Sequence, residues 1–515
     1  MNGAESLLRT LVRGGVDVCL TNPGTSEMQF VAAFDRVPEM RCVLGLFEGV
    51  VSGAADGYAR MTDKPAATLL HLGPGLANGL ANFHNAMRAR VPVVNIVGDH
   101  ATYHKQCDAP LTSDIATYAR PVSGWIHELS DPKSVPGSTV AAIHAALQPP
   151  GRIATLIVPS EVAWSDSVAP VDAEVIPPQR AKVDDMAIQQ AATALRSEGP
   201  SILLMTGHVL RAQGLELASR IINRTHARVF CDTFNTRLQR GAGRAPIERL
   251  PYFPEAVIDT LAGTRHLIIV GSRPPVGFFA YPDIPERLIP PECAVHILAK
   301  PEEDGIDALM RLAMELGADK QAPVLQPLHR PGLPEGDLTP ETIAIAVASL
   351  LPENAIVADE SITAGAPLLP HTAGAAPHDW LFITGGAVGQ GLPMATGAAI
   401  ACPDRKVLCL QADGSGMYTL QALWTQAREQ LDVTTVIFAN RQYRILNIEF
   451  ERLNAGNPGE KAGNMLAIDR PDIDWVKLAE GMGVPAHQVT TLDEFNRYLG
   501  SFLAEQGPNL IEVIL

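Results

Sequence analysis

Two polar residues in the last quarter of the chain have the types and the spacing that a bound Mg²⁺ ion needs. Asp413 and Asn440 stand 27 positions apart, and the apolar runs 406–411 and 434–439 before them are typical of buried strands. Apolar side chains at helical spacing lie between the runs, which predicts one crossover helix between two parallel strands. Both residues then lie at the carboxyl edge of a sheet, and the main-chain carbonyl of Gln442 adds a third oxygen ligand.

The residues that follow Asp413 favour a phosphate group beside the metal ion. The main-chain amides of Gly414 and Ser415 would open the crossover helix and face phosphate oxygens. The alternative is that Ala412-Asp413-Gly414-Ser415 forms only a turn with a helix cap, which is the commoner role of an isolated Asp-Gly-Ser. The spacing to Asn440 and the two flanking strands favour the metal site.

This pattern resembles the metal-binding signature of the thiamine-diphosphate enzymes, Gly-Asp-Gly followed by Asn-Asn. Ala412 and Ala439 replace the usual first Gly and first Asn, and neither position is expected to bind the metal. The segment 45–49, which precedes 53–60, resembles the part of the family that carries an activating glutamate, with Phe47 in place of the usual His. Further matches extend the resemblance along almost the whole chain: Asn22-Pro23-Gly24-Thr25, His71 before Gly73-Pro74-Gly75, Gly385-Gly386-Ala387-Val388 before Gly391-Leu392-Pro393, and Gly507–Val513.

The resemblance implies a role for each matching residue in holding the cofactor. Glu48 would hydrogen-bond the pyrimidine ring and relay its proton, Gly386 would offer its carbonyl to the 4′-amino group, and Val388 would press the cofactor into its bent shape. Thr363 would contact phosphate. Each role has an ordinary structural alternative: a first-turn carboxylate for Glu48, core packing for Val388 and a helix cap for Thr363.

Two N-terminal positions bear on the substrate. Thr25 and His71 match a Ser and a His that line the active site of benzoylformate decarboxylase, and a His there can transfer protons to intermediates. The alternative for Thr25 is a helix start, because Ser26 and Gln29 have the spacing of a capping box. The alternative for His71 is a polar residue that closes a strand.

Other positions depart from the better-known members or leave their roles open. Leu446 stands where pyruvate decarboxylase has its catalytic Glu, and Ala280 stands where benzoylformate decarboxylase has its second active-site His. Glu449 falls where the family lines the substrate pocket, and a carboxylate there would disfavour a simple aromatic 2-oxo acid unless solvent covers it. His100 and His104 fall near the site by the same resemblance and are either extra acid-base groups or surface residues.

The resemblance implies non-oxidative decarboxylation of a 2-oxo acid, dependent on thiamine diphosphate and Mg²⁺ and proceeding through an ylide and an enamine. The alternative is a carboligase of the acetolactate synthase type, in which the enamine is captured by an aldehyde or a second oxo acid to form a 2-hydroxyketone. A more remote alternative is a non-catalytic protein of the same fold. FAD is not expected, since residues 202–299 contain no FAD-specific motif.

The resemblance also implies an α/β fold with three doubly wound parallel-sheet domains. We expect a pyrimidine-binding domain over 1–168, a central domain over 185–320 and a diphosphate-binding domain over 338–515, separated by proline-rich linkers. In the family, the pyrimidine and the diphosphate are held by different subunits. A homodimer is therefore the smallest expected active unit, and a homotetramer is favoured.

Composition agrees with a globular α/β enzyme. The 515 residues are 46% hydrophobic and 5% aromatic, with a formal net charge of −16, which argues against nucleic acid or an anionic membrane as a partner. Seven cysteines without metal-type spacing favour reduced, buried thiols. The beginning of the chain has no basic and apolar leader pattern, and no apolar run reaches 18 residues, so we expect a cytoplasmic location without a membrane span.

Overall fold

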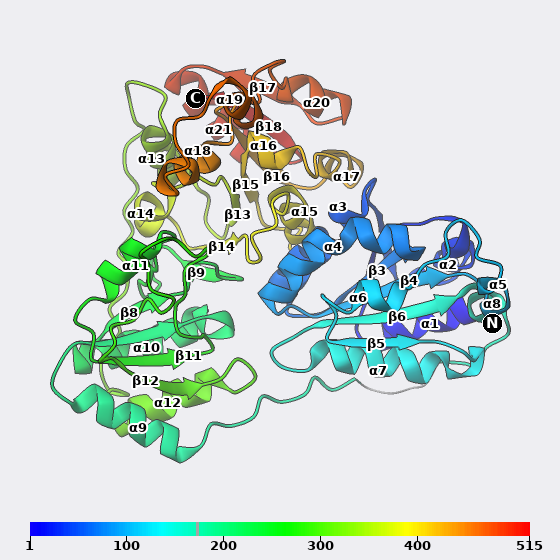
Figure 1. Ribbon diagram of the computed structural model, residues 1–515, viewed down its shortest axis with the longest axis horizontal. Coiled ribbons are helices and arrows are strands. Elements are labelled where there is room, and N and C mark those ends of the chain that lie inside the picture. The colour runs from blue at the N-terminus through cyan, green and yellow to red at the C-terminus, as the bar shows by residue number, and fades with distance from the viewer. Residues whose placement is uncertain (171–174) are drawn as a thin grey trace.

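Three α/β parts, each built around its own sheet, make up the computed structural model, which describes residues 1–170 and 175–515 (Figure 1). The N-terminal sheet has six parallel strands in the order β2-β1-β3-β4-β6-β5. Helices cover both of its faces, as expected of a doubly wound sheet. Its strands are β1 (Val18–Asn22), β2 (Arg41–Leu44), β3 (Ala66–His71), β4 (Val93–Asp99), β5 (Trp125–Glu128) and β6 (Ile153–Pro159). Its helices are α1 (Gly3–Arg13), α2 (Met28–Phe34), α3 (Glu48–Thr62), α4 (Leu72–Ala89), α5 (Thr102–Lys105), α6 (Ile115–Ala119), α7 (Val135–Leu147) and α8 (Ser160–Trp164).

The central sheet is also fully parallel, in the order β10-β8-β7-β11-β12. The apolar runs 201–205 and 266–270 form the neighbouring strands β7 and β11. The strands are β7 (Ser201–Met205), β8 (Arg228–Cys231), β10 (Glu248–Arg249), β11 (His266–Val270) and β12 (Ala294–Ala299). The helices are α9 (Asp185–Arg196), α10 (Ala212–Thr225), α11 (Pro254–Leu261) and α12 (Gly305–Glu315).

The C-terminal sheet has seven strands in the order β17-β18-β16-β15-β13-β14-β9. Its edge strand β9 (Leu238–Arg240) belongs by sequence to the central part and pairs antiparallel with β14, an addition that the sequence did not predict. The other strands are β13 (Ile356–Glu360), β14 (His378–Phe382), β15 (Val407–Ala412), β16 (Val433–Ala439), β17 (Ala486–Val489) and β18 (Asn509–Ile514). The helices are α13 (Pro340–Leu350), α14 (Leu368–His371), α15 (Gly391–Ala401), α16 (Asp413–Gly416), α17 (Ala422–Arg428), α18 (Arg444–Arg452), α19 (Glu460–Leu466), α20 (Trp475–Gly481) and α21 (Leu492–Ala504).

The predicted single crossover helix after Asp413 is wrong, because α16 and α17 are separate. The chain turns between them and carries the Thr419 hydroxyl to the main-chain oxygen of Gly389, 2.9 Å away. A side chain at Gly416 would meet the Trp475 ring at 2.7 Å, so this segment is shaped by contacts from distant parts of the chain. Sequence periodicity carries no information about such contacts.

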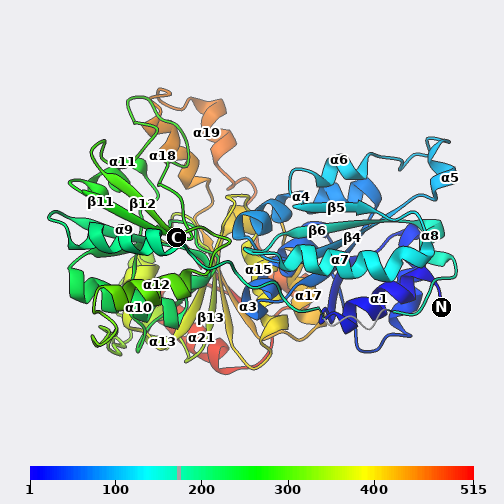
Figure 2. The ribbon, with the colours of Figure 1, turned by 90° about the horizontal axis from the view of Figure 1, so that it is seen from below.

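The N-terminal and C-terminal parts share one hydrophobic core, in which α3 packs against α15 (Figure 2). The two helices approach to backbone contact: a Cβ at Gly57 would lie 2.2 Å from the Met394 oxygen, and one at Gly397 would lie 1.9 Å from the Ala54 oxygen. The small residues of the 53–60 motif are therefore explained by close helix packing.

Three further sequence expectations concern the domain boundaries, the cysteines and membrane-spanning helices. The domain boundaries at 168, 185, 320 and 338 stay predictions. All seven cysteines are unpaired, but they are not uniformly buried, since Cys42 and Cys107 are exposed. Within the described residues, none of the helices has the length and the apolar character needed to span a bilayer.

Candidate active site

Four neighbouring strands of the C-terminal sheet end at the residues predicted to hold the cofactor. The order β16-β15-β13-β14 places Asn440 beside Asp413, followed by Thr363 and by the turn 384–391 that carries Gly386 and Val388. Because these strands are parallel, all four positions lie at one edge of the sheet, which is where open α/β sheets bind ligands. The structure thus brings the predicted C-terminal residues together.

The oxygens predicted to bind Mg²⁺ lie on two touching loops. The Asp413 carboxylate is 3% exposed and accepts hydrogen bonds from the main-chain N–H of Gly414 (2.8 Å) and of Arg441 (2.7 Å). The Asn440 Oδ1 atom accepts from the main-chain N–H of Gln442 at 3.1 Å. Burial raises the pKa of Asp413, so a nearby cation would stabilise its ionised form. A carboxylate and amide oxygens in this setting fit a hard divalent cation, which would take its other ligands from phosphate and water.

Within the described residues, no group of three or more His, Cys, Asp and Glu side chains could hold a metal ion. The predicted Mg²⁺ site is not a group of this kind, because it has one carboxylate together with amide oxygens. It would need further ligands from a bound phosphate. The Ser415 hydroxyl, in the predicted phosphate-binding segment, accepts a hydrogen bond from the Gln411 side-chain amide at 2.5 Å.

Left-handed backbone marks three positions next to predicted site residues. Leu72 (φ +52°) follows His71, Ile362 (φ +51°) precedes Thr363, and Arg441 (φ +57°) lies between Asn440 and Gln442. This region is unfavourable for residues with bulky or branched side chains, and such strain gathers at functional sites. Eight other non-glycine residues of the described chain also have positive φ, so it is the β-branched Ile362, next to Thr363, that stands out as a genuine outlier.

The turn 384–391 is fixed from several sides. The Asn85 Oδ1 atom accepts from the main-chain N–H groups of Gly385 (3.1 Å) and Ala387 (3.2 Å). Gly386 has φ +77°, and a Cβ there would lie 2.6 Å from the Phe278 ring, so this position needs glycine for both its conformation and its contact. Val388 is half-buried in the same turn. The predicted cofactor residues of this turn therefore sit on a rigid support.

Glu48 is the first residue of α3 and is 8% exposed. Its Oε2 atom accepts a hydrogen bond from the Asn78 side chain at 3.0 Å. Asn82 donates one hydrogen bond to the Gly49 oxygen (2.8 Å) and another to the Gly389 oxygen (3.1 Å), which ties the start of α3 to the turn 384–391 of the same chain. The Glu48 carboxyl is thus largely buried at the start of α3.

His71 closes β3 and is held by an acid that sequence reasoning missed. Its Nδ1 atom lies 2.8 Å from the Oε2 atom of Glu27, whose side chain is fully buried. Ser26 contacts both residues, at 3.0 Å from Nδ1 and 2.7 Å from Glu27 Oε1. Thr25 is exposed, and it is Ser26 next to it that reaches the histidine. The Glu27 Oε2 atom also accepts a hydrogen bond from the main-chain N–H of Gly24 at 2.8 Å. The spacing of three residues between Gly24 and Glu27 was the only sequence signal for this role.

The two loop histidines, His100 and His104, differ in exposure. His100 follows β4 at the same sheet edge as His71, and its ring lies 5.7 Å from that of the exposed His104. The Nε2 atom of His100 is buried, with no hydrogen-bond partner among the described residues.

Glu449 is half-buried and lies among polar groups. Its Oε1 atom accepts from the Tyr281 hydroxyl at 3.0 Å, and Arg452 lies 3.8 Å from its Oε2 atom. Arg452 also binds both oxygens of Glu255 and stacks on the Tyr281 ring. Because Glu449 and Glu255 share the single guanidinium of Arg452, the charge that was expected to disfavour an aromatic substrate is only partly offset.

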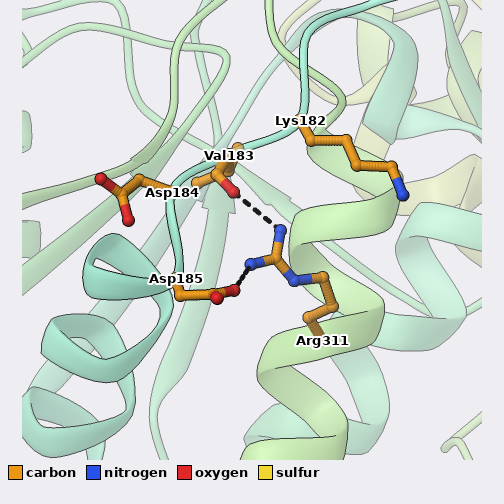
Figure 3. Close-up of a pocket in the computed structure, with 5 residues that line it drawn as sticks. All are labelled: Lys182, Val183, Asp184, Asp185 and Arg311. Carbon is orange, nitrogen blue, oxygen red and sulfur yellow. Dashed lines mark hydrogen bonds and ion pairs between the residues drawn. The ribbon is translucent and has the colours of Figure 1, made fainter.

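A small pocket in the central part lies apart from this edge, where the chain enters α9 beside α12 (Figure 3). Two of its four charged side chains face each other, since Arg311 pairs with Asp185 and also donates to the Val183 oxygen, whereas Lys182 and Asp184 point away from this pair (Figure 3). The pocket contains none of the predicted site residues.

Two stretches of the chain match the two cofactor-binding domains of one family. Residues 1–131 match the thiamine pyrophosphate enzyme N-terminal TPP binding domain, and residues 370–513 match its C-terminal TPP binding domain. The chain therefore belongs to the thiamine pyrophosphate enzymes, as its motifs predict.

Individual relatives match over the full length. A Mycobacterium tuberculosis protein, provisionally named acetolactate synthase large subunit IlvX, is 54% identical and covers 100% of this chain and 99% of its own. Benzoylformate decarboxylase of Pseudomonas aeruginosa is 28% identical, with 98% and 97% covered. The solved structure of the thiamine diphosphate-dependent 4-hydroxybenzoylformate decarboxylase of Rhodococcus jostii RHA1 is 26% identical, with a TM-score of 0.86 over 100% of this chain and 99% of that one.

Proposed function

We propose that this protein uses thiamine diphosphate and Mg²⁺ to remove CO₂ from a 2-oxo acid without oxidation. The observation that carries the proposal is His71, which is oriented by the buried Glu27 at the sheet edge next to the Glu48 helix. Two relatives named as benzoylformate-type decarboxylases support the same reaction class.

The C-terminal residues would hold the cofactor's charged end. Asp413, Asn440 and the Gln442 carbonyl would bind Mg²⁺, and the amides of Gly414 and Ser415 would face the diphosphate. Thr363 would add a hydroxyl. When bound, thiamine diphosphate supplies a carbanion that adds to the ketone carbon of a 2-oxo acid and accepts the electrons released as CO₂ leaves.

The N-terminal residues would handle protons. The Glu48 carboxyl would hold the proton at the pyrimidine nitrogen, while the Gly386 carbonyl and the Val388 side chain would fix the ring's orientation. The Glu27 carboxylate would keep a proton on His71 Nδ1 and leave Nε2 to deliver a proton to the product carbon. Thr25, next to the Ser26 that contacts His71, would face the substrate.

The test measures CO₂ release with thiamine diphosphate and Mg²⁺ from aromatic, aliphatic and acidic 2-oxo acids. We expect release without any second substrate, and faster release from apolar acids, because the Phe278 ring lies against Gly386. The matched variant is His71→Ala, which should slow product formation while the cofactor still binds. If no acid of the panel yields CO₂ from cofactor-loaded protein, the decarboxylase proposal falls.

A second candidate is carboligation of the acetolactate synthase type. It is favoured by the 54% identical relative that carries that provisional name. In that case the second carbonyl compound takes the place of the proton from His71. CO₂ release that requires an aldehyde or a second 2-oxo acid, together with a 2-hydroxyketone product, would support this candidate over the first.

A further inference from the structure

A buried carboxylate that is not among the predicted site residues contacts the turn 384–391. Glu360 is the last residue of β13 and is 1% exposed. Its Oε1 atom accepts the main-chain N–H of Gly389 at 2.7 Å, and its Oε2 atom accepts the N–H of Gly391 at 2.5 Å. One side chain therefore fixes both N–H groups at the end of the turn that carries Gly386 and Val388.

Glu360 also faces the segment predicted to bind phosphate. Its register partner on β15 is Gln411, whose side-chain amide donates to the Ser415 hydroxyl at 2.5 Å. A Cβ at Gly391 would lie 2.3 Å from Gln411 Oε1 and 3.1 Å from Glu360 Oε2, so the two side chains meet at this glycine. The Gln411 Oε1 atom is buried, with no hydrogen-bond partner in the part of the chain that the structure describes.

Packing alone does not explain a carboxylate at this position. Burial raises the pKa of Glu360 to about 7, and the hydrogen bonds that oppose this rise come from main-chain N–H groups of the turn and from Gln411. Among the described residues Glu360 has no cationic partner, so burial of its charged form is expensive, and an apolar side chain would end the strand at a lower cost. An apolar residue could not accept hydrogen bonds from the N–H groups of Gly389 and Gly391, whereas Glu360 provides one oxygen for each.

We propose that Glu360 is a positioning residue for the cofactor, which holds the Gly389–Gly391 end of the turn and couples it through Gln411 to Ser415. The inference rests on the proposed function, because it assumes that this turn and Ser415 contact one bound molecule. Glu360 itself acts through the main chain and through Gln411.

The test compares the binding of thiamine diphosphate with Mg²⁺ by calorimetry in the wild type and in Glu360→Gln. The amide variant turns an N–H toward the N–H of Gly389 or Gly391, so we expect the dissociation constant to rise about tenfold or more. Glu360→Asp keeps two acceptor oxygens on a shorter side chain and should bind with intermediate affinity. If Glu360→Gln does not fold, the dissociation constant of Glu360→Asp tests the same role.

The matched control is Glu512→Gln, which changes another buried carboxylate of the same sheet. Glu512 is 1% exposed, lies on β18 and accepts from Gln488 at 3.2 Å. We expect this variant to keep the wild-type dissociation constant even if its melting temperature without cofactor falls. Wild-type affinity in both Glu360 variants, or an equal loss in Glu512→Gln, would overturn the positioning role.

Failure of the proposed function would look different. In that case the wild type binds the cofactor but releases no CO₂, while the affinity difference between wild type and Glu360→Gln still decides the role of Glu360. A wild type that does not bind the cofactor at all would overturn both.

Discussion

The imidazole of His71 lies against a residue that has no side chain. A Cβ at Gly24 would stand 2.3 Å from the ring Cγ and 2.4 Å from Nδ1, well inside any real contact. The same glycine donates its N–H to Glu27, so the orientation of the histidine depends on this one position. A family motif, Asn-Pro-Gly-Thr, is thereby given a physical reason.

We predict that Gly24→Ala lowers kcat by about 10- to 100-fold, because a displaced His71 loses its hydrogen bond to Glu27. Cofactor affinity should stay near the wild-type value, since the residues proposed to bind Mg²⁺ and the diphosphate lie in the C-terminal part. Steady-state kinetics and calorimetry measure the two quantities. Gly137→Ala is the control, because a Cβ at Gly137 meets no atom within 4 Å. Equal activity in both variants would contradict the proposed role of His71.

Glu48 allows a second test at the same scale. We predict that Glu48→Gln lowers turnover by orders of magnitude, because an amide keeps the shape of the side chain but cannot hold and release the proton. The fold should persist, since Asn78 can still hydrogen-bond an amide oxygen. Circular dichroism and size-exclusion chromatography check the fold, and the exposed Glu39→Gln serves as control. Unchanged turnover would remove Glu48 from the chemistry.

Helix α3 connects the three parts of the molecule through one buried ion pair. Asp56 and Arg60 have fully buried side chains and lie 2.8 Å apart. Arg60 also donates to the main-chain oxygens of Thr236 (3.1 Å) and Phe382 (2.6 Å), while Asp56 accepts from Gln390 in the turn 384–391. The helix that begins with Glu48 is thus tied to the central part and to the C-terminal sheet.

We predict that Asp56→Asn destabilises the protein by about 3–5 kcal/mol, because it leaves the buried guanidinium of Arg60 without its counter-charge. Chemical denaturation followed by fluorescence measures the loss. Asp63→Asn is the matched control, since Asp63 pairs with Arg211 from an exposed position and should cost less than about 1 kcal/mol. A loss of similar size in both variants would mean that the buried pair does not stabilise the packing of α3.

Much of the site could be predicted because its residues follow apolar runs, and strand ends are readable from sequence. Asp413 and Asn440 were placed at one sheet edge in this way, whereas the turn after β14 was identified only by its resemblance to the family motif. Glu27 and Glu360 were missed because their importance depends on burial and on partners far along the chain, 44 positions away for His71 and 29 for Gly389. The separation of α16 from α17 was not predicted for the same reason, because the contacts of this segment with Trp475 and Gly389 join residues that are far apart in the sequence.

At the scale of the whole molecule, the subunit arrangement can be tested without a structure of the assembly. If one cofactor is held by Glu48 of one subunit and Asp413 of another, each inactive variant lacks a different half of the site. We predict that Glu48→Gln and Asp413→Ala, dissociated together and reassembled in equal amounts, regain about a quarter of wild-type activity. Each variant alone, taken through the same procedure, is the control. No regain from verified mixed dimers would place both halves of the site on one chain.

The strand β9 has a consequence for attempts to separate the three parts. Leu238–Arg240 comes from the middle of the chain but supplies the outermost strand beside β14. A gene fragment that encodes only residues 338–515 would expose the unpaired backbone of β14, a ready template for intermolecular association. The three parts therefore cannot be exchanged independently of one another. Replacing the middle part by that of a relative requires the incoming segment to bring its own border strand, with side chains that fit this sheet.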